Sequence, residues 1–593
     1  MVAIILAAGN GSRIADIYSC SSKCMLPFEG KPLLDKKLQL LSKCHGLNRL
    51  YIVVKAGEQD IQAYFGYDYN GIPIEYHIQD RNSPGIINAV YSVSHLKYMS
   101  HEEIIINLAD EFYEELDYSS LITEHRSRKS SVTPVVIFSE DESRIMENYT
   151  VCFDENGLIT EAIEKPSKVF NNYIGCGTIA VSGKLLYDFA QACKNKFDGK
   201  QLVDWIKYAN DTNRSCYIYK AQTKYCNVNN KKNMKYLFSL SCKETTKSIG
   251  KTLNRVATFF PQRVAVRCDN SFVTYKELDE KSDAVACNVL QYRLSAEDYF
   301  TVKCNRTADD IISFLGILKA GLSYLPFDEK HLYEGAVQAA NIAAKLPGDP
   351  ERVLINSRLA ANSATGIKAE VFDKLDKEHL EIGVTSMFSC YSSVQQIYSA
   401  LLYGHTLNII PLKAVFSPRS FVSWLNKVDV CDVTPHMIYY LIEYKRQNPH
   451  ATMRAKHILT PSGGLDRKLI KEFFLMFETS SIHILHSFAG TTIPSAMFSL
   501  DKKTEEYLSH IPIGKPMRNT RIYILDSDRK IISAGKTGDI WLCGDAVSMV
   551  CYYNADEYNN MLCTDIIDSS CKMIKTGAKG YVDKNGYYCI ADN

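Results

Sequence analysis

Apolar runs and segments of helical periodicity alternate through the first half of the chain. Runs rich in β-forming side chains predict buried strands, and they occur at residues 2–6, 50–54, 74–78 and 104–108. Between these runs, apolar residues recur at helical spacing at residues 33–44 and 58–65. Alternation of strands and helices predicts an α/β domain whose mostly parallel sheet has helices on both faces.

The first predicted strand runs directly into a loop that contains two glycines. This segment reads Leu6, Ala7, Ala8, Gly9, Asn10, Gly11, Ser12 and Arg13. Glycine lets the backbone approach a ligand closely, so that its N–H groups can point at phosphate oxygens. Arg13 and the later Lys23 can neutralise phosphate charge. The pattern predicts a triphosphate site, although a strand followed by glycines can also be only a tight turn.

Polar residues follow two further predicted strands. Gln79 follows the strand at 74–78, and Pro84-Gly85 comes soon after it, where it can simply be the turn that starts a helix. Asp110 follows the strand at 104–108. Because ligands bind outside the carboxyl ends of strands in open α/β sheets, Asp110 is a candidate binding residue. Glu111 is expected to be a solvated neighbour.

Three motifs of the first half resemble those of the nucleotidyltransferase family that joins an NTP to a sugar 1-phosphate or a related phosphate. Residues 6–13 follow the family's L-A-A-G-x-G-[ST]-R motif. Residues 22–27 follow its P-K-x-M-L-P motif, with Ser22 in place of proline, and residues 30–33 follow its G-K-P-L motif. The resemblance covers residues 1–240 and implies a Rossmann-like nucleotidyltransferase domain.

The resemblance also implies a role for each matching residue. Arg13, Lys23 and Asp110 correspond to catalytic residues. The nucleotide would contact Leu6, Ala8, Gly9, Asn10, Gly11, Ser12, Gln79 and Gly85. The phosphorylated acceptor would contact Glu164, Lys165, Asn172 and Gly177, and the expected cofactor, Mg²⁺, would bind Asp110 and Asn227. Because an amide side chain offers both a donor and an acceptor, Gln79 favours a pyrimidine base.

Several positions depart from the family pattern or have a structural alternative. Thr150 replaces a glycine that approaches the sugar closely in the family, which suggests a changed acceptor pocket. Asn227 replaces the aspartate that is the second metal ligand, and its amide oxygen can coordinate a metal but carries no charge. The segment Glu164-Lys165 could instead form an ion pair at a helix cap, and Gly177 could be an ordinary strand glycine.

The second half resembles the adenylate-forming enzymes, most of all the amino-acid-activating domains of nonribosomal peptide synthetases. The resemblance rests on segments in the family's order, among them 259–266, 314–328, 511–516 and 535–544. It implies an α/β domain with a β-barrel part at residues 251–593, after a linker at 241–250, and without the small C-terminal lid. The phosphate loop is replaced at best by residues 362–368, and the acidic residues of three site motifs are lost at 463–465, 488–492 and 576–578. These losses predict a non-catalytic domain.

Composition limits the partners and the location. The 68 Lys and Arg residues balance the 67 Asp and Glu residues, so no general basic field points to a nucleic-acid partner. No apolar run is long enough to span a bilayer, and Met1 leads directly into a strand, so a cytoplasmic protein without a membrane partner is expected. The 19 cysteines are scattered without CxxC pairs and are predicted to be free thiols.

The function predicted from the sequence is that of a nucleotidylyltransferase. It would transfer NMP from an NTP, with a pyrimidine base favoured, to a sugar 1-phosphate or a similar small phosphorylated acceptor, with release of pyrophosphate. One alternative is a cytidylyltransferase that acts on a non-sugar phosphate such as phosphocholine or on a phosphonate. Others are a carboxylate-adenylating enzyme and a non-catalytic ligand-binding or assembly protein, in which the second half could mediate homo-oligomerisation or hold a carrier protein.

Overall fold

The computed structural model describes two compact units. The described residues run from 1 to 591, without residues 10–11, 20–21, 81, 198, 242–247, 269–270, 293–298, 328–354, 479, 489–493, 507–508, 545–546 and 548–560. Unit 1 comprises Met1–Ser241 with Leu525–Lys536 and Val582–Gly586, and unit 2 comprises Cys242–Ile524, Thr537–Tyr581 and Tyr587–Asn593. Helices α8 (Lys231–Ser241) and α9 (Ile249–Phe259) flank and slightly overlap the linker predicted at 241–250.

Ten strands form the main sheet in the described part of unit 1. Its continuous path runs β11-β10-β12-β7-β1-β4-β6-β5, and β9 joins β12 and β13 beside it. The neighbours β7, β1, β4 and β6 are parallel, as the apolar runs predict, and the flanking pairs are mostly antiparallel. The strands are β1 (Val2–Leu6), β4 (Arg49–Lys55), β5 (Asp68–Tyr69), β6 (Ile72–Gln79), β7 (Glu103–Leu108), β9 (Val132–Phe138), β10 (Tyr149–Phe153), β11 (Ile159–Glu164), β12 (Tyr173–Ser182) and β13 (Tyr219–Lys220).

Alternate residues of the central strands enter two separate cores, one on each face of the sheet. Ile4 and Leu6 of β1 belong to one core, and Ala3 and Ile5 belong to the other. Burial on both faces explains why β1 is apolar at every position. One core includes α3 (Ile86–Tyr91), α6 (Gly183–Ala192) and α7 (Leu202–Asp211), and the other includes α1 (Leu33–Leu41), α2 (Asp60–Phe65), α4 (Tyr118–Ser127) and α5 (Glu142–Glu147).

Short strands complete unit 1 around the carboxyl edge of this sheet. Strand β8 (Glu111–Tyr113) pairs with β14 (Tyr225–Asn227), and β2 (Pro27–Phe28) pairs with β3 (Lys31–Pro32). Single 3-10 turns occur at Ser12–Ile14, Lys23–Met25 and Leu96–Tyr98. The antiparallel pairing of β8 with β14 matters most, because it brings a late segment of the unit beside the end of β7.

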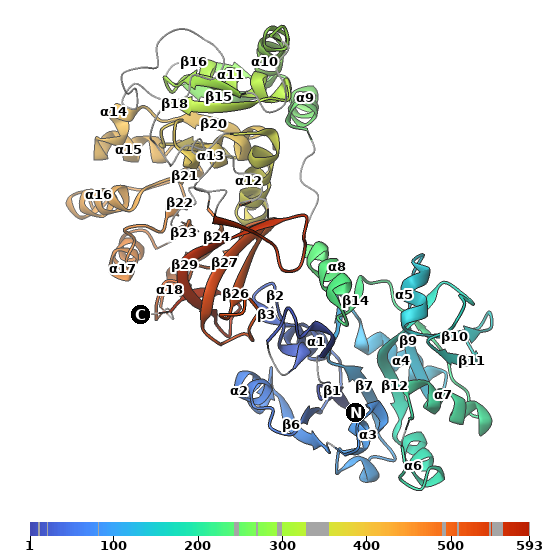
Figure 1. Ribbon diagram of the computed structural model, residues 1–593. Helices are drawn as coiled ribbons and strands as arrows, with labels where there is room; N and C mark the ends of the chain where they lie inside the picture. Colours follow the sequence, from blue (N-terminus) through green and yellow to red (C-terminus); the bar gives the residue numbers. More distant parts are fainter. Residues whose placement is uncertain are drawn as a thin grey trace. The chain divides into compact units, whose positions relative to one another are not determined.

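Unit 2 contains a second large sheet of nine described strands, parallel from β15 to β23 (Figure 1). Its order is β16 (Ser271–Thr274), β15 (Val264–Cys268), β20 (Thr406–Ile409), β19 (Glu381–Val384), β21 (Val430–Asp432), β22 (His457–Pro461), β23 (Ser481–His486), β24 (Ala496–Asp501) and β25 (Lys515–Pro516). Strands β17 (Tyr299–Lys303) and β18 (Ser323–Phe327) form a separate parallel pair.

The helices of unit 2 connect these strands. Besides α9, the described helices are α10 (Tyr275–Leu290), α11 (Ala308–Lys319), α12 (Ser357–Glu370), α13 (Tyr391–Leu401), α14 (Leu412–Val415), α15 (Pro418–Leu425), α16 (Pro435–Gln447), α17 (Arg467–Met476) and α18 (Lys502–Glu505). A further sheet of five described strands consists of β26 (Thr520–Leu525), β27 (Gly538–Gly544), β28 (Leu562–Thr564), β29 (Lys572–Val582) and β30 (Tyr588–Ile590). Among the described residues, every helix is too short or too polar to span a lipid bilayer.

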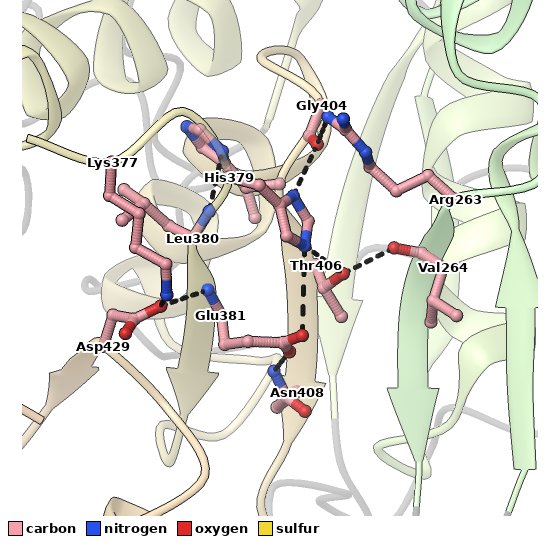
Figure 2. Close-up of polar contacts among 12 residues, drawn as sticks. Arg263, Val264, Lys377, His379, Leu380, Glu381, Gly404, Thr406, Asn408 and Asp429 are labelled. Atoms are coloured by element: carbon pink, nitrogen blue, oxygen red, sulfur yellow. Dashed lines mark hydrogen bonds and ion pairs between the residues drawn. The ribbon is translucent and has the colours of Figure 1, made fainter. Parts of the chain in front are cut away.

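A polar network lies around the amino ends of β19 and β20 (Figure 2). The His379 ring lies 3.9 Å from the Glu381 carboxylate and 3.3 Å from the Thr406 hydroxyl. Asn408 donates to the other oxygen of Glu381 at 2.7 Å, and the Glu381 backbone N–H donates to Asp429 at 2.8 Å. These groups satisfy one another at the edge opposite to the one where ligands bind in α/β sheets, which indicates a structural role.

Candidate active site

A cavity of about 440 Å³ opens at the carboxyl edge of the unit 1 sheet. Its lining includes most of the residues predicted to form the site: Leu6, Ala8, Gly9, Arg13, Lys23, Gln79, Gly85, Asp110, Glu164, Lys165, Gly177 and Asn227. Asn10 and Gly11 lie outside the described residues, and Ser12 begins the first 3-10 turn. Asn172 does not line the cavity, and its carbonyl accepts a hydrogen bond from the Ser139 N–H at 2.9 Å.

The strand order explains why the glycine loop and Asp110 meet. From β1 the sheet continues through β4 to β6 on one side and to β7 on the other, so β1 and β7 flank a topological switch point. The Ala109 N–H donates to the Leu6 carbonyl at 3.1 Å, which joins the ends of the two strands. Chain segments that leave these strands therefore diverge around a crevice, and the cavity occupies that crevice.

A cationic side chain lies beside the carboxylate of Asp110. The Lys23 ammonium lies 3.6 Å from the Asp110 carboxylate and donates a 2.9 Å hydrogen bond to Asn229. The Ser22 hydroxyl donates to the Ala7 carbonyl at 3.3 Å, which ties the segment carrying Lys23 to the end of β1. Arg13 also lines the cavity and is exposed. The arrangement offers two cations to a polyanionic ligand.

The pairing of β8 with β14 brings Asp110 and Asn227 together. Asn227 stands opposite Glu111 in the register, and the Val228 N–H donates to the Asp110 carbonyl at 3.0 Å. The Asn227 amide nitrogen lies 3.5 Å from the Asn148 side-chain oxygen. The amide oxygen of Asn227 is buried and has no hydrogen-bond partner among the described residues.

These oxygens fit the requirements of Mg²⁺. A buried acceptor without a donor is costly to keep, and a cation would satisfy it. Mg²⁺ in nucleotide sites uses one or two protein oxygens and takes its remaining ligands from phosphate and water. No cluster of three or more His, Cys, Asp or Glu side chains suited to a metal occurs in the described part of the chain. Asp110 and Asn227 would therefore hold the ion only together with a bound nucleotide.

The other end of the cavity is formed by β10, β11 and β12. Lys165 follows β11 with a positive φ of 44°, and its N–H donates to the Asn148 carbonyl at 3.0 Å. A side chain in this backbone region costs about 1–3 kcal/mol, which the surrounding contacts must offset. On β12, a Cβ added to Gly175 would lie 2.1 Å from the Tyr149 ring, so only glycine fits there.

Glu111 is buried rather than solvated, which corrects the expectation from the sequence. Its side chain is 2% exposed and lines the cavity floor. The carboxylate accepts the Gly177 N–H at 2.9 Å, the Tyr225 hydroxyl at 2.7 Å and the Tyr113 hydroxyl at 2.8 Å. Burial raises the pKa of Glu111, and the nearby Lys37 ammonium opposes that rise.

Lys37 is a second residue that the sequence reasoning missed. It is 2% exposed, and its ammonium donates a short hydrogen bond to the carbonyl of Leu108, the last residue of β7. Burial lowers the pKa of Lys37, and Glu111 and Asp110 oppose that change. A signal was present in the sequence, because Lys37 falls between Leu34 and Leu41 on the apolar stripe of α1.

Thr150, like Asn172, does not line the cavity. It is fully buried, and its hydroxyl donates to the Tyr173 carbonyl at 2.9 Å and to Asn171 at 3.2 Å. These contacts stabilise the junction of β10 and β12 instead of shaping an acceptor pocket.

Comparison with family models identifies both halves. Residues 2–219 match the family model described as nucleotidyl transferase, and residues 348–553 match the one described as AMP-binding enzyme. The chain joins a nucleotidyl transferase domain to an AMP-binding domain. Most residues that line the cavity at the carboxyl edge of β1 and β7 lie within the matched residues 2–219, and Asn227 and Asn229 follow them.

Two peptide synthases are among the proteins similar to this chain, and both are distant. Bacitracin synthase 1 of Bacillus licheniformis is 24% identical over 395 residues, which cover 57% of this chain and 7% of that protein. The dimodular nonribosomal peptide synthase of Bacillus subtilis is 22% identical over 370 residues, 52% of this chain and 15% of that protein. The chain thus spans a small part of these relatives. The crystal structure of CmiS6 has a TM-score of 0.50 at 17% identity and covers 59% of this chain and 98% of its own, which shows a shared fold.

Two described motif positions of the AMP-binding domain differ from the pattern of the adenylate-forming enzymes. Residues 362–368, the only candidates for a phosphate loop in the sequence, lie inside helix α12, where nearly all are buried. Ala578 occupies β29 at the position where the family carries the ribose-binding aspartate. Residues 489–492 of the former metal motif lie outside the described residues.

Proposed function

We propose that the nucleotidyl transferase domain transfers NMP from an NTP to a small phosphorylated acceptor, such as a sugar 1-phosphate, and releases pyrophosphate. One observation carries the proposal: Arg13, Lys23, Asp110, Lys165 and Asn227 converge on a single cavity of about 440 Å³. Three cations together with the Asp110 carboxylate and the Asn227 amide oxygen suit a nucleotide and an acceptor phosphate bound side by side.

The reaction needs positioning and charge neutralisation more than proton transfer. An oxygen of the acceptor phosphate attacks the α-phosphorus, and the bond from that phosphorus to the pyrophosphate oxygen breaks. A phosphate dianion is already a nucleophile, so no general base is required. Arg13 and Lys23 would neutralise the triphosphate, and Lys165 would hold the acceptor phosphate. Mg²⁺, held by Asp110 and Asn227, would supply further positive charge to the phosphate oxygens.

Gln79 supports a pyrimidine base. Its amide nitrogen donates to the carbonyls of Ser83 at 3.1 Å and Gly85 at 2.9 Å, which orders the loop before α3. The amide oxygen is an acceptor and suits the exocyclic amine of cytosine or the ring N–H of uracil. The loop and Gln79 together would therefore read the edge of a pyrimidine.

A specific observation favours one alternative acceptor. Glu147, Glu164 and Tyr149 line the cavity beside Lys165. Two carboxylates and an aromatic ring suit a cationic substituent better than a neutral sugar. The alternative is therefore a cytidylyltransferase whose acceptor carries both a phosphate, facing Lys165, and an ammonium group, as phosphocholine does.

The test is a screen for pyrophosphate release with Mg²⁺ present. CTP, UTP, dTTP, ATP and GTP are each paired with glucose 1-phosphate, phosphocholine and 2-aminoethylphosphonate. We expect turnover with a pyrimidine NTP, loss of that turnover in Lys23→Ala, and no change in Lys43→Ala, whose exposed side chain lies outside the cavity. Absence of turnover with every pair, together with unchanged NTP binding in Arg13→Ala, would refute the proposal.

For the AMP-binding domain we propose a non-catalytic role in assembly, as a surface for a second copy of the chain or for a carrier protein. Ala578 and the helical setting of residues 362–368 support this role, because both remove groups that would bind ATP. Carboxylate adenylation is the competing function. Amino-acid-dependent exchange of pyrophosphate into ATP by the full chain, retained in Lys23→Ala, would establish it and overturn the non-catalytic role.

A further inference from the structure

Four hydrogen-bond contacts converge on the carboxylate of Glu111. The Gly177 N–H of β12 lies 2.9 Å from one carboxylate oxygen and 3.0 Å from the other. The Tyr225 hydroxyl of β14 donates to the first oxygen at 2.7 Å, and the Tyr113 hydroxyl of β8 donates to the second at 2.8 Å. Each oxygen thus has two protein donors, which uses the acceptor sites of a carboxylate. Although Glu111 lines the cavity, it therefore acts on the neighbouring strands and not directly on a substrate.

Gly177 lies where the pairing of β12 is interrupted, which explains why its N–H bonds to a side chain. Strand β12 changes register with β9 between Gly175 and Ile179. A buried backbone N–H in such a gap needs another acceptor, and the Glu111 carboxylate supplies it. A Cβ added to Gly177 would lie 2.4 Å from the Leu108 side chain, so β12 packs closely on β7 at the same point. Glu111 therefore holds the segment of β12 that lines the cavity.

The same carboxylate is linked to the residues proposed to hold Mg²⁺. Glu111 directly follows Asp110 in the chain and stands opposite Asn227 in the register of β8 and β14. Tyr225 stands opposite Tyr113 in the same register, and both hydroxyls donate to Glu111. These two hydrogen bonds fasten β14 to β8 at the point where Asn227 comes beside Asp110.

A buried cation supports the network from α1. The Lys37 ammonium donates to the Leu108 carbonyl at the end of β7 and lies 5.2 Å from the centroid of the Tyr113 ring, within the range of a cation–π contact. Lys37, Tyr113 and Glu111 are each at most 2% exposed. Buried polar groups that are bonded on several sides have little freedom to move, so the network fixes the ends of β7, β8, β12 and β14 together.

We propose that Glu111 is a positioning residue for nucleotidyl transfer, which holds the acceptor end of the cavity at a fixed distance from Asp110 and Asn227. This role rests on the function proposed above. In-line attack needs the reacting atoms about 3–3.5 Å apart, and a misplacement of about 1 Å costs on the order of 100-fold in rate. Gly177 lies at the acceptor end and Tyr225 lies two residues before Asn227, and the Glu111 carboxylate is bonded to both.

The first experiment compares Glu111→Leu, which removes both acceptor oxygens, with Glu111→Gln, which keeps one oxygen and the shape of the side chain. In Glu111→Leu, the acceptor KM and the Mg²⁺ concentration for half-maximal pyrophosphate release should each rise about tenfold, and Glu111→Gln should restore most of both. The dissociation constant of the NTP at saturating Mg²⁺ should not change, because Lys23 is held by Asn229 instead. A smaller folded fraction would lower the maximal rate without moving either concentration.

A second pair of variants keeps the carboxylate and covers the case in which Glu111→Leu fails to fold. Tyr225→Phe removes one donor to Glu111. Tyr118→Phe is the matched control, because Tyr118 is as buried as Tyr225 and its hydroxyl donates to the Asn107 side chain at 2.7 Å. Each variant loses one buried hydroxyl. The Mg²⁺ concentration for half-maximal rate should rise about tenfold in Tyr225→Phe and should stay unchanged in Tyr118→Phe.

Hydrogen exchange of the full chain without metal or nucleotide gives a readout that does not depend on turnover. The Val228 N–H donates to the Asp110 carbonyl at 3.0 Å, so exchange of this amide reports how closely β14 approaches Asp110. Residue-resolved mass spectrometry should show exchange of the Val228 amide about tenfold faster in Tyr225→Phe than in Tyr118→Phe.

The outcomes separate the positioning role from the function on which it rests. If the unsubstituted chain turns over and Tyr225→Phe matches Tyr118→Phe in both readouts, Glu111 does not position the site, and the proposed function stands. Faster exchange of the Val228 amide with an unchanged Mg²⁺ requirement and acceptor KM would also overturn the role, because the network would then support only the fold. Absence of turnover by the unsubstituted chain with every substrate pair would remove the function and the positioning role together.

Discussion

The buried pair of Lys37 and Glu111 supports a quantitative prediction about the floor of the active site. Lys37→Met removes the ammonium that faces Glu111 and the donor to the Leu108 carbonyl. Lys37 and Glu111 are not in direct contact, but each buried charge partly compensates the other, and removing one partner of a buried ion pair costs about 3–5 kcal/mol as an upper reference. Glu111 keeps three hydrogen bonds, from Gly177, Tyr113 and Tyr225, so we expect the lower end, about 3 kcal/mol.

Hydrogen exchange of the full chain is the suitable assay, because two units make a single global unfolding free energy ill-defined. A loss of about 3 kcal/mol in the local free energy of unfolding should speed hydrogen exchange of the protected amides of β7 and β12 on the order of 100-fold. Lys36→Met is the matched control, since Lys36 is adjacent on α1 but partly exposed. In the Lys36→Met variant, the peptides of β7 and β12 should exchange as they do in the unsubstituted protein.

A double-variant cycle decides whether the two residues act as a pair. Lys37→Met/Glu111→Gln removes both charges, so its cost should fall below the sum of the single variants by about 2 kcal/mol. Unchanged protection of β7 and β12 from hydrogen exchange in Lys37→Met would refute the reasoning. It would also be refuted if the costs of the two single variants added up to the cost of the double variant within about 0.5 kcal/mol.

Three further predictions follow from named residues. Asn227→Asp should lower the Mg²⁺ concentration that gives half-maximal pyrophosphate release, because a charge is added beside Asp110; an unchanged or higher Mg²⁺ requirement would contradict a ligand role for this side chain. Gly175→Ala should abolish turnover, because the added Cβ would lie 2.1 Å from the Tyr149 ring, and retention of full activity would show that β12 can shift. Burial lowers the pKa of His483 to about 3, so the stability it contributes is present above about pH 6.5 and is lost as the pH falls. Hydrogen exchange of β23 should therefore reveal that the free energy of unfolding falls by about 2–3 kcal/mol between about pH 7 and pH 4.5. His483→Gln should reduce this fall, and the exposed control His450→Gln should leave it unchanged.

Much of the nucleotidyl transferase domain could be predicted from local sequence pattern. The strands at 2–6, 50–54, 74–78 and 104–108 are present, with β4, β6 and β7 slightly longer than predicted. The helix predicted at 33–44 ends at Leu41, because the next hydrogen bonds span three residues instead of four: the Lys43 N–H donates to Leu40 and the Cys44 N–H to Leu41. Apolar periodicity determines such elements because it reports which side of each segment must be buried.

The glycine segment at 6–13, Lys23 and Asp110 could likewise be recognised from the sequence, because each follows a strand end and carries a group suited to phosphate or metal. Their meeting in one cavity was decided only by the strand order, which places β1 between β7 and β4. The approach of Asn227 to Asp110 depends on the pairing of β14 with β8, a contact between distant segments that no local pattern reports. For the same reason Glu111 was expected to be solvated, although its hydrogen-bond partners Tyr113, Tyr225 and Gly177 bury it. The sequence by itself determined which residues have the right chemistry, and the tertiary structure decided which of them are neighbours, because burial, charge and pKa depend on groups that only folding brings together.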